Sequence, residues 1–96
     1  MGRIVHTDMS LRRVRLEAEA LADLAEEWGE ISEDEQIDFA MQWRDATDHL
    51  RSLEELHAAG EMTGAQEQEY AKIKRRIAGL LPTIERLELS SPGVPL

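Results

Sequence analysis

Apolar residues recur every three or four positions through most of the chain, in three separate stretches. This spacing places them on one face of a helix. In the first stretch the repeat is followed by Gly29, a residue that enters the left-handed conformation at a helix end without strain. We therefore predict a first helix from about Ser10 to Trp28, with Gly29 as its C-terminal cap. The apolar positions of this stretch are Leu11, Val14, Ala18, Leu21, Leu24, Ala25 and Trp28.

The second stretch opens with Ser32, and a glutamate, Glu35, follows three residues later. A serine and a glutamate at this spacing are typical of a capping box at a helix start. The apolar repeat then continues until Gly60, which predicts a second helix of about 27 residues. Its repeat positions are Phe39, Trp43, Ala46, Leu50, Leu53 and His57.

The third stretch begins with the same capping signal, formed by Thr63 and Gln66. Pro82 lies inside it, and proline within a helix removes a backbone hydrogen bond. Because the apolar repeat passes through Pro82 without a change of phase, we expect a kinked but continuous helix; a break near Gly79 to Pro82 is the alternative. The repeat positions are Tyr70, Ile73, Ile77, Leu80, Ile84 and Leu87.

Three helices joined by short turns predict an all-α fold, an antiparallel three-helix bundle with a long hairpin of the second and third helices. The bundle occupies residues 10–89, after an extended or disordered N-terminal arm over 1–9 and before a flexible C-terminal tail over 90–96 that is rich in proline, glycine and serine. The predicted first helix is shorter than the other two by about a third, so one end of the hairpin would be uncovered. We therefore expect a homodimer.

The positions that we expect in the bundle core or in an oligomer seam are Leu21, Trp28, Phe39, Trp43, Leu50, Leu53, Tyr70, Ile73, Ile77, Leu80 and Ile84.

Length and composition exclude several classes of protein. The chain has 96 residues, enough for one domain, and no cysteine. Its formal net charge is −9, from 20 acidic and 11 basic side chains, which argues against nucleic acid as a partner. No apolar run approaches the roughly 18 residues of a membrane span. We expect a cytoplasmic protein that binds neither nucleic acid nor membranes.

The negative charge is concentrated in residues 16–43, which contain no lysine or arginine. These carboxylates would serve as a solvated helix face that complements a helix dipole, or as a docking surface for a basic partner. The candidate partner-binding residues are Glu26, Glu27, Glu30, Glu33, Asp34 and Glu35.

Basic residues form two clusters, over 12–15 and over 72–76. Cations near a helix start oppose the helix dipole, so those of the first cluster need a compensating benefit. Ordinary solubility, an ion pair with the acidic segment of a neighbouring chain, or contact with phosphate would each supply it.

Few residues offer catalytic chemistry. Glu54 and His57 have the Glu-x-x-His spacing of di-metal carboxylate bundles, but such a site needs a second motif and two more carboxylates facing inward. The missing carboxylates would have to come from positions off the seam such as Glu61 or Glu69. Ser10 and Ser32 are better interpreted as helix caps than as nucleophiles. We predict no catalytic residues, no metal site and no cofactor.

These features together favour a non-catalytic, acidic helical module that binds and regulates a basic partner protein, in the manner of an antitoxin, inhibitor or chaperone. The alternative is a structural subunit that joins a hetero-oligomeric complex through its apolar seam. A metal-binding bundle of carboxylates and histidines is a further alternative.

Overall fold

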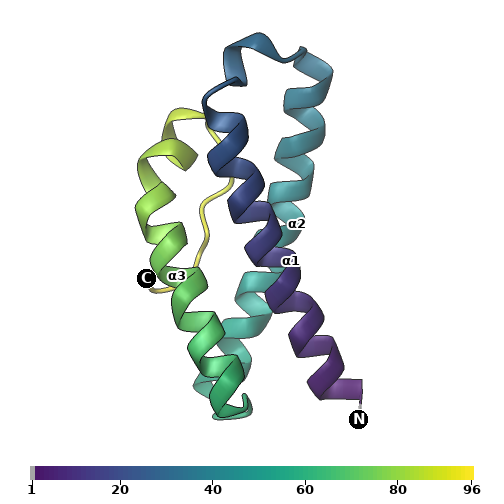
Figure 1. Cartoon of the computed structure of the whole chain (residues 1–96), viewed down its shortest axis with the longest axis vertical. Coiled ribbons are helices and arrows are strands. Elements are labelled where there is room, and N and C mark those ends of the chain that lie inside the picture. The colour runs from purple at the N-terminus through teal and green to yellow at the C-terminus, as the bar shows by residue number, and fades with distance from the viewer. Residues whose placement is uncertain (1) are drawn as a thin grey trace.

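The computed structural model describes residues 2–96, with side chains from His6 onward. Three helices pack together: α1 (Gly2–Ala25), α2 (Glu33–Ala58) and α3 (Gly64–Arg86), with a short 3-10 turn, η1 (Trp28–Glu30), between the first two. The described residues contain no strand, so the prediction of an all-helical fold of three packed helices is confirmed. The molecule measures 42 × 24 × 18 Å; the α1–α2 connection lies at one end and the α2–α3 turn at the other (Figure 1).

Helix α1 forms the centre of the packing, because the contacts between helices are concentrated on it. Toward α2, Ser10 lies beside His49 and Arg13 beside Asp45, so residue numbers rise along α1 as they fall along α2. The opposite flank of α1 follows α3 in the same numerical direction, from Asp8 beside Gln66 to Arg15 beside Glu69. The second and third helices are therefore positioned mainly by a shared neighbour.

Helix α1 begins well before the predicted position. Met1 lies outside the described residues, and the remainder of the predicted N-terminal arm belongs to the helix. Thr7 and Ser10 continue the buried face of α1 toward its start, with 5% and 6% of their surface exposed. Because both are polar, the apolar pattern stops short of them. Ser10 is accordingly an interior helix residue and not a cap.

The end of α1 also differs from the prediction. The helix stops at Ala25, and Gly29 lies within η1, outside the left-handed region in which glycine acts as a cap. The turn places the Trp28 and Phe39 rings edge to face, with 6.0 Å between ring centroids. The Trp28 carbonyl accepts a hydrogen bond of 2.7 Å from Gln36 Nε2. These contacts with α2 favour the tighter turn.

With α1 now 24 residues long, against 26 in α2 and 23 in α3, the expectation of a short first helix is wrong. The uncovered hairpin end that argued for a homodimer is thus removed.

Ser32 and Thr63 cap α2 and α3 as predicted, but the reciprocal bond of the capping box is recorded for α3 and not for α2. Ser32 Oγ accepts a hydrogen bond from the Glu35 amide at 3.1 Å. Thr63 and Gln66 form a complete capping box, with each side chain bonded to the other residue's backbone amide. Gly60 ends α2 in the left-handed conformation, with φ 69°, as predicted. Helix α3 continues through Pro82 to Arg86, so the helix is continuous.

The core lies where the three helices meet. Among the seam positions named above, Trp28 and Leu80 are half-buried and the others are buried. Leu11, Val14 and Ala18 of α1 complete the same cluster. None of the described helices carries an apolar stretch of the length that crossing a bilayer requires.

Helix α3 ends in a left-handed turn built on an unusual residue. The Leu89 amide donates to the Ile84 carbonyl at 2.9 Å, and the Glu88 amide donates to the Glu85 carbonyl at 3.1 Å. This is the Schellman pattern, whose left-handed position usually holds glycine. Here Glu88 occupies it with φ 58°. The apolar contact that accompanies this motif is supplied by Ile84 and Leu89, which join the core cluster.

The turn at Glu88 sends the C-terminal tail back along the bundle beside α3 (Figure 1). Trp43 of α2 is 1% exposed, and its indole N–H donates to the Ser90 carbonyl at 2.8 Å. Pro92 is buried, Gly93 lies against Arg51, and Val94 packs on the core. The tail is non-helical as expected, but it covers part of the core, which its composition did not suggest.

We expect the substitution Glu88→Gly to stabilise the protein by about 1 kcal/mol, because glycine removes the steric cost of the left-handed conformation. For a domain of this size, that gain corresponds to a rise in Tm of about 4–8 °C in a thermal melt. Glu85→Gly, in the last turn of α3, is the matched control and should lower stability by about 1 kcal/mol. A Glu88→Gly variant that melts at or below the wild-type temperature would contradict this account of the turn.

Candidate functional site

Six exposed carboxylates gather around the α1–α2 connection, and we call them the acidic end. They are Glu26, Glu27, Glu30, Glu33, Asp34 and Glu35, the candidate partner-binding residues of the sequence. All six side chains belong to exposed residues, and none of them forms an ion pair within the part of the chain that the structure describes. The structure therefore leaves their charge open to solvent.

Local structure explains this arrangement. Glu33, Asp34 and Glu35 form the first turn of α2, where the partial positive charge of the helix start stabilises carboxylates. Glu26 and Glu27 follow the last turn of α1, and η1 carries Glu30 around the corner. The connection is held by the Glu30 amide, which donates to the Glu27 carbonyl at 2.8 Å. The charges thus project from a hydrogen-bonded turn.

Two residues of the first basic cluster form ion pairs within the bundle and not with the acidic end. Arg13 lies 3.0 Å from Asp45, and Arg15 lies 3.3 Å from Glu69. Both are links from α1 to a neighbouring helix. They belong to the first basic cluster, so part of the benefit that offsets its unfavourable helix dipole is intramolecular.

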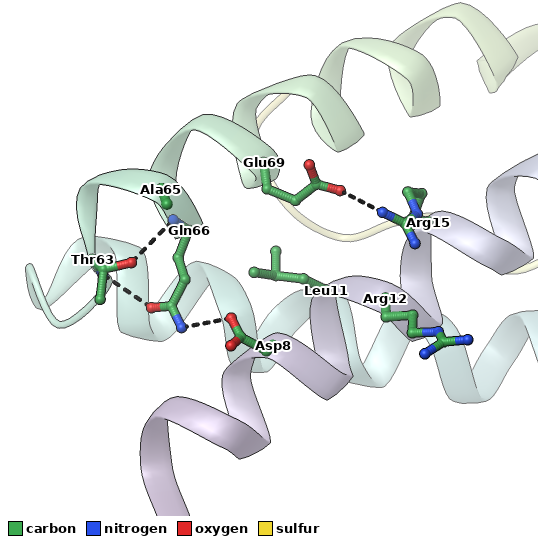
Figure 2. A pocket seen from close by; sticks show the side chains of 8 residues that line it. All are labelled: Asp8, Leu11, Arg12, Arg15, Thr63, Ala65, Gln66 and Glu69. Atoms are coloured by element: carbon green, nitrogen blue, oxygen red, sulfur yellow. Dashed lines mark hydrogen bonds and ion pairs between the residues drawn. The ribbon is translucent and has the colours of Figure 1, made fainter. Parts of the chain in front are cut away.

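A shallow hollow of about 260 Å³ lies between the first half of α1 and the start of α3 (Figure 2). Gln66 Nε2 donates to Asp8 Oδ1 at 2.9 Å, while Gln66 Oε1 accepts from the Thr63 amide at the same distance. One buried side chain thus caps α3 and fastens it to α1. The guanidinium of Arg12 points away from the other labelled side chains (Figure 2). The polar groups of this hollow are used mainly to join helices.

The Glu-x-x-His motif does not assemble a metal site. Glu54 Oε1 accepts from the Tyr70 hydroxyl at 2.6 Å and lies 3.4 Å from Lys74 Nζ. His57 Nδ1 lies 2.7 Å from Glu67 Oε1. Both side chains are thus directed to partners on α3. Throughout the described residues, no group of three or more histidine, cysteine, aspartate or glutamate side chains is placed to hold a metal ion.

The carboxyl of Glu54 and the phenol of Tyr70 shift each other's titration. The hydrogen bond from Tyr70 lowers the pKa of Glu54; partial burial opposes this shift, and the charge of Lys74 adds to it. Burial raises the pKa of Tyr70, and the bond to Glu54 raises it further. The phenol therefore stays protonated as a donor, and the carboxylate stays charged as its acceptor.

The structure also joins Ser10, His49 and Asp45, which the sequence did not bring together. Ser10 Oγ lies 3.1 Å from His49 Nδ1, and His49 Nε2 lies 3.7 Å from Asp45 Oδ2. The order of groups is that of a hydrolytic triad. However, Ser10 lies inside α1, where neighbouring backbone amides are engaged in helical hydrogen bonds, so an oxyanion hole does not form beside it. The arrangement serves as a polar link between α1 and α2.

Comparison with known proteins adds no functional information, since no family, curated protein or solved structure matches this chain.

We expect Tyr70→Phe to destabilise the protein by about 1–2 kcal/mol at pH 7, because Glu54 loses its closest donor while remaining half-buried. The folded-state pKa of Glu54 is lowered, so its contribution is present above its ordinary pKa of about 4.5 and is lost as the pH falls below that value. The difference between wild type and variant should therefore shrink in urea unfolding at pH 3. An equal difference at both pH values would show that the contribution of the Tyr70 hydroxyl does not depend on the charge of Glu54.

Proposed function

We propose that this chain is a non-catalytic interaction module that binds a basic partner protein through its acidic end, at one tip of an antiparallel bundle. The observation that carries the proposal is the set of exposed carboxylates without an ion pair in the described part of the chain. Concentrated charge of one sign attracts a partner of the opposite sign and raises the association rate.

The local structure supports this use of the acidic end. Ser32 caps α2, and Gln36 bonds the Trp28 carbonyl, so the backbone under the carboxylates is fixed before binding. A preorganised surface loses less conformational entropy on association than a mobile one. The partner that fits is a protein with a lysine- and arginine-rich surface, which the module would mask or hold in the manner of an inhibitor, antitoxin or chaperone.

A pair of charge reversals tests the proposal. We expect Glu27→Lys with Glu30→Lys to abolish capture of a basic protein, of pI above about 9, from extracts of the source cells. Both positions lie outside the first turn of α2, so the helix dipole is unaffected. Pull-down with the tagged chain, followed by mass spectrometry, identifies the partner; titration calorimetry with the purified partner then measures the affinity and its dependence on salt.

Asp48→Lys with Glu55→Lys is the matched control. Each pair of substitutions changes the net charge by the same amount, from −9 to −5, but Asp48 and Glu55 lie on the second half of α2, away from the acidic end. The control should bind as the wild type does. Equal binding by both double variants would reduce the acidic end to a solvated surface, and equal loss in both would assign the attraction to net charge alone.

A further inference from the structure

Exposed apolar side chains gather on the outer face of α1 and α2, on the side away from α3. Leu16 is 44% exposed and Met41 66% exposed. Arg13 and Asp45 pair across the two helices, and Leu16 follows Arg13 by one turn of α1 while Met41 precedes Asp45 by one turn of α2. Because the two helices run in opposite numerical directions, Leu16 and Met41 lie at the same level of this face.

Met9 and Ile37 extend the apolar strip to either side of this pair. Met9 precedes Leu16 by two turns of α1 and is 64% exposed. Ile37 precedes Met41 by one turn of α2 and is 51% exposed. The strip therefore runs along the helices, with Leu16 and Met41 between its two ends. We call these four residues the α1/α2 strip.

The half of the strip near Met9 is hollow and basic. A cavity of about 480 Å³ is lined there by Met9 and Leu16 together with Arg12 and Arg13, and by the imidazoles of His6 and His49. Arg12 is exposed and forms no ion pair among the described residues. A surface that carries both carboxylates and apolar side chains would complement this cavity, because the carboxylates would pair with its arginines and the apolar groups would pack on Met9 and Leu16.

The other half of the strip has the complementary character. Ile37 is flanked by Asp34 and Asp38, in a segment of the chain that contains no lysine or arginine. Asp38 is exposed and lies about 12 Å along the bundle from Arg12, given the pairing of α1 with α2 and a rise of about 1.5 Å per residue. One face thus carries a basic half and an acidic half on either side of an apolar centre.

We propose that a second copy of this chain covers the α1/α2 strip. A two-fold axis through the level of Leu16 and Met41 places the basic half of each copy on the acidic half of the other, because a two-fold interface must be complementary to itself. Leu16 then meets the partner's Leu16 and Met41 the partner's Met41, and the half of the strip that carries Met9 and Arg12 lies on the half of the partner's strip that carries Ile37 and Asp38. Burial of these apolar side chains supplies the affinity, and the charges fix the antiparallel orientation.

This inference does not rest on the proposed binding of a basic partner: Asp34, which flanks Ile37, belongs to the acidic end, but Leu16, Arg12 and Asp38, the residues changed in the tests below, lie outside it. Failure of either proposal leaves the other unaffected. A dimer can form without any partner protein, and a monomer could still bind a basic partner through the α1–α2 connection.

Disulfide trapping gives a direct test, because the natural chain contains no cysteine. Under mild oxidation, Leu16→Cys should form a covalent dimer in high yield, since the two-fold axis brings the two thiols together. Leu81→Cys, at an exposed apolar position of α3 of similar exposure, 40%, is the matched control and should remain monomeric on a non-reducing gel. Equal crosslinking of both variants would overturn the assignment of the interface.

Charge exchange provides an independent test of orientation. Sizing with light scattering should give about twice the chain mass of 10.9 kDa for the wild type at micromolar concentration. We expect Arg12→Glu and Asp38→Lys each to weaken the dimer about tenfold or more, and the double variant in one chain to restore it. A restored dimer would show that the two exchanged charges attract each other between copies, because within one chain Arg12 and Asp38 are too far apart along the bundle to form an ion pair.

Circular dichroism of every variant checks that the helices remain folded, so that loss of the dimer reports on the interface. A wild type that remains monomeric, or single and double charge variants that dimerise equally well, would overturn the proposal. In the first case the strip would remain available to a different protein, as expected for a subunit of a hetero-oligomeric complex.

Discussion

The packing of this protein depends on one constraint: α1 buries a face wide enough for two neighbours. Val14 and Leu21 are 1% and 0% exposed, and they lie between the flank that contacts α2 and the flank that contacts α3. Polar side chains at the edges of this face fix the alignment. Ser10 and Arg13 align α2, while Asp8 aligns α3 through Gln66. Because α2 and α3 both pack mainly on α1, the bundle should unfold as a single cooperative unit.

The regular parts of the fold follow from local chemistry, and the sequence therefore predicts them well. Ser32, Thr63 and Gly60 mark helix ends through interactions within one turn. The extension of α1 could not be predicted in this way, because Thr7 and Ser10 are polar residues that are nevertheless buried, and Ser10 has its partner, His49, on α2. The return of the tail could not be predicted either. The turn that produces it has a glutamate, Glu88, at the left-handed position at which glycine is expected.

Some features of the candidate site can likewise be read from the sequence, and others depend on contacts between helices. A stretch without lysine or arginine is visible in the sequence, and so is the clustering of carboxylates around a turn. The pairing of the other charges is not visible, because Glu54 and His57 share a helix but find their partners on α3. Their spacing fits a metal-binding motif, but these partners on α3 direct the two side chains to other interactions. The charge asymmetry of the α1/α2 face likewise depends on the alignment of two helices, which Arg13 and Asp45 reveal.

The two tryptophans occupy environments that differ enough to act as separate optical reporters. Trp43 is enclosed, and its indole nitrogen is bonded to the tail at Ser90, so its fluorescence should respond when the tail detaches. Trp28 is half-buried against Phe39 beneath the acidic end, so its emission should respond when that end is covered. With one tryptophan replaced at a time, events at the tip of the molecule and along its side could be followed separately, without any external dye.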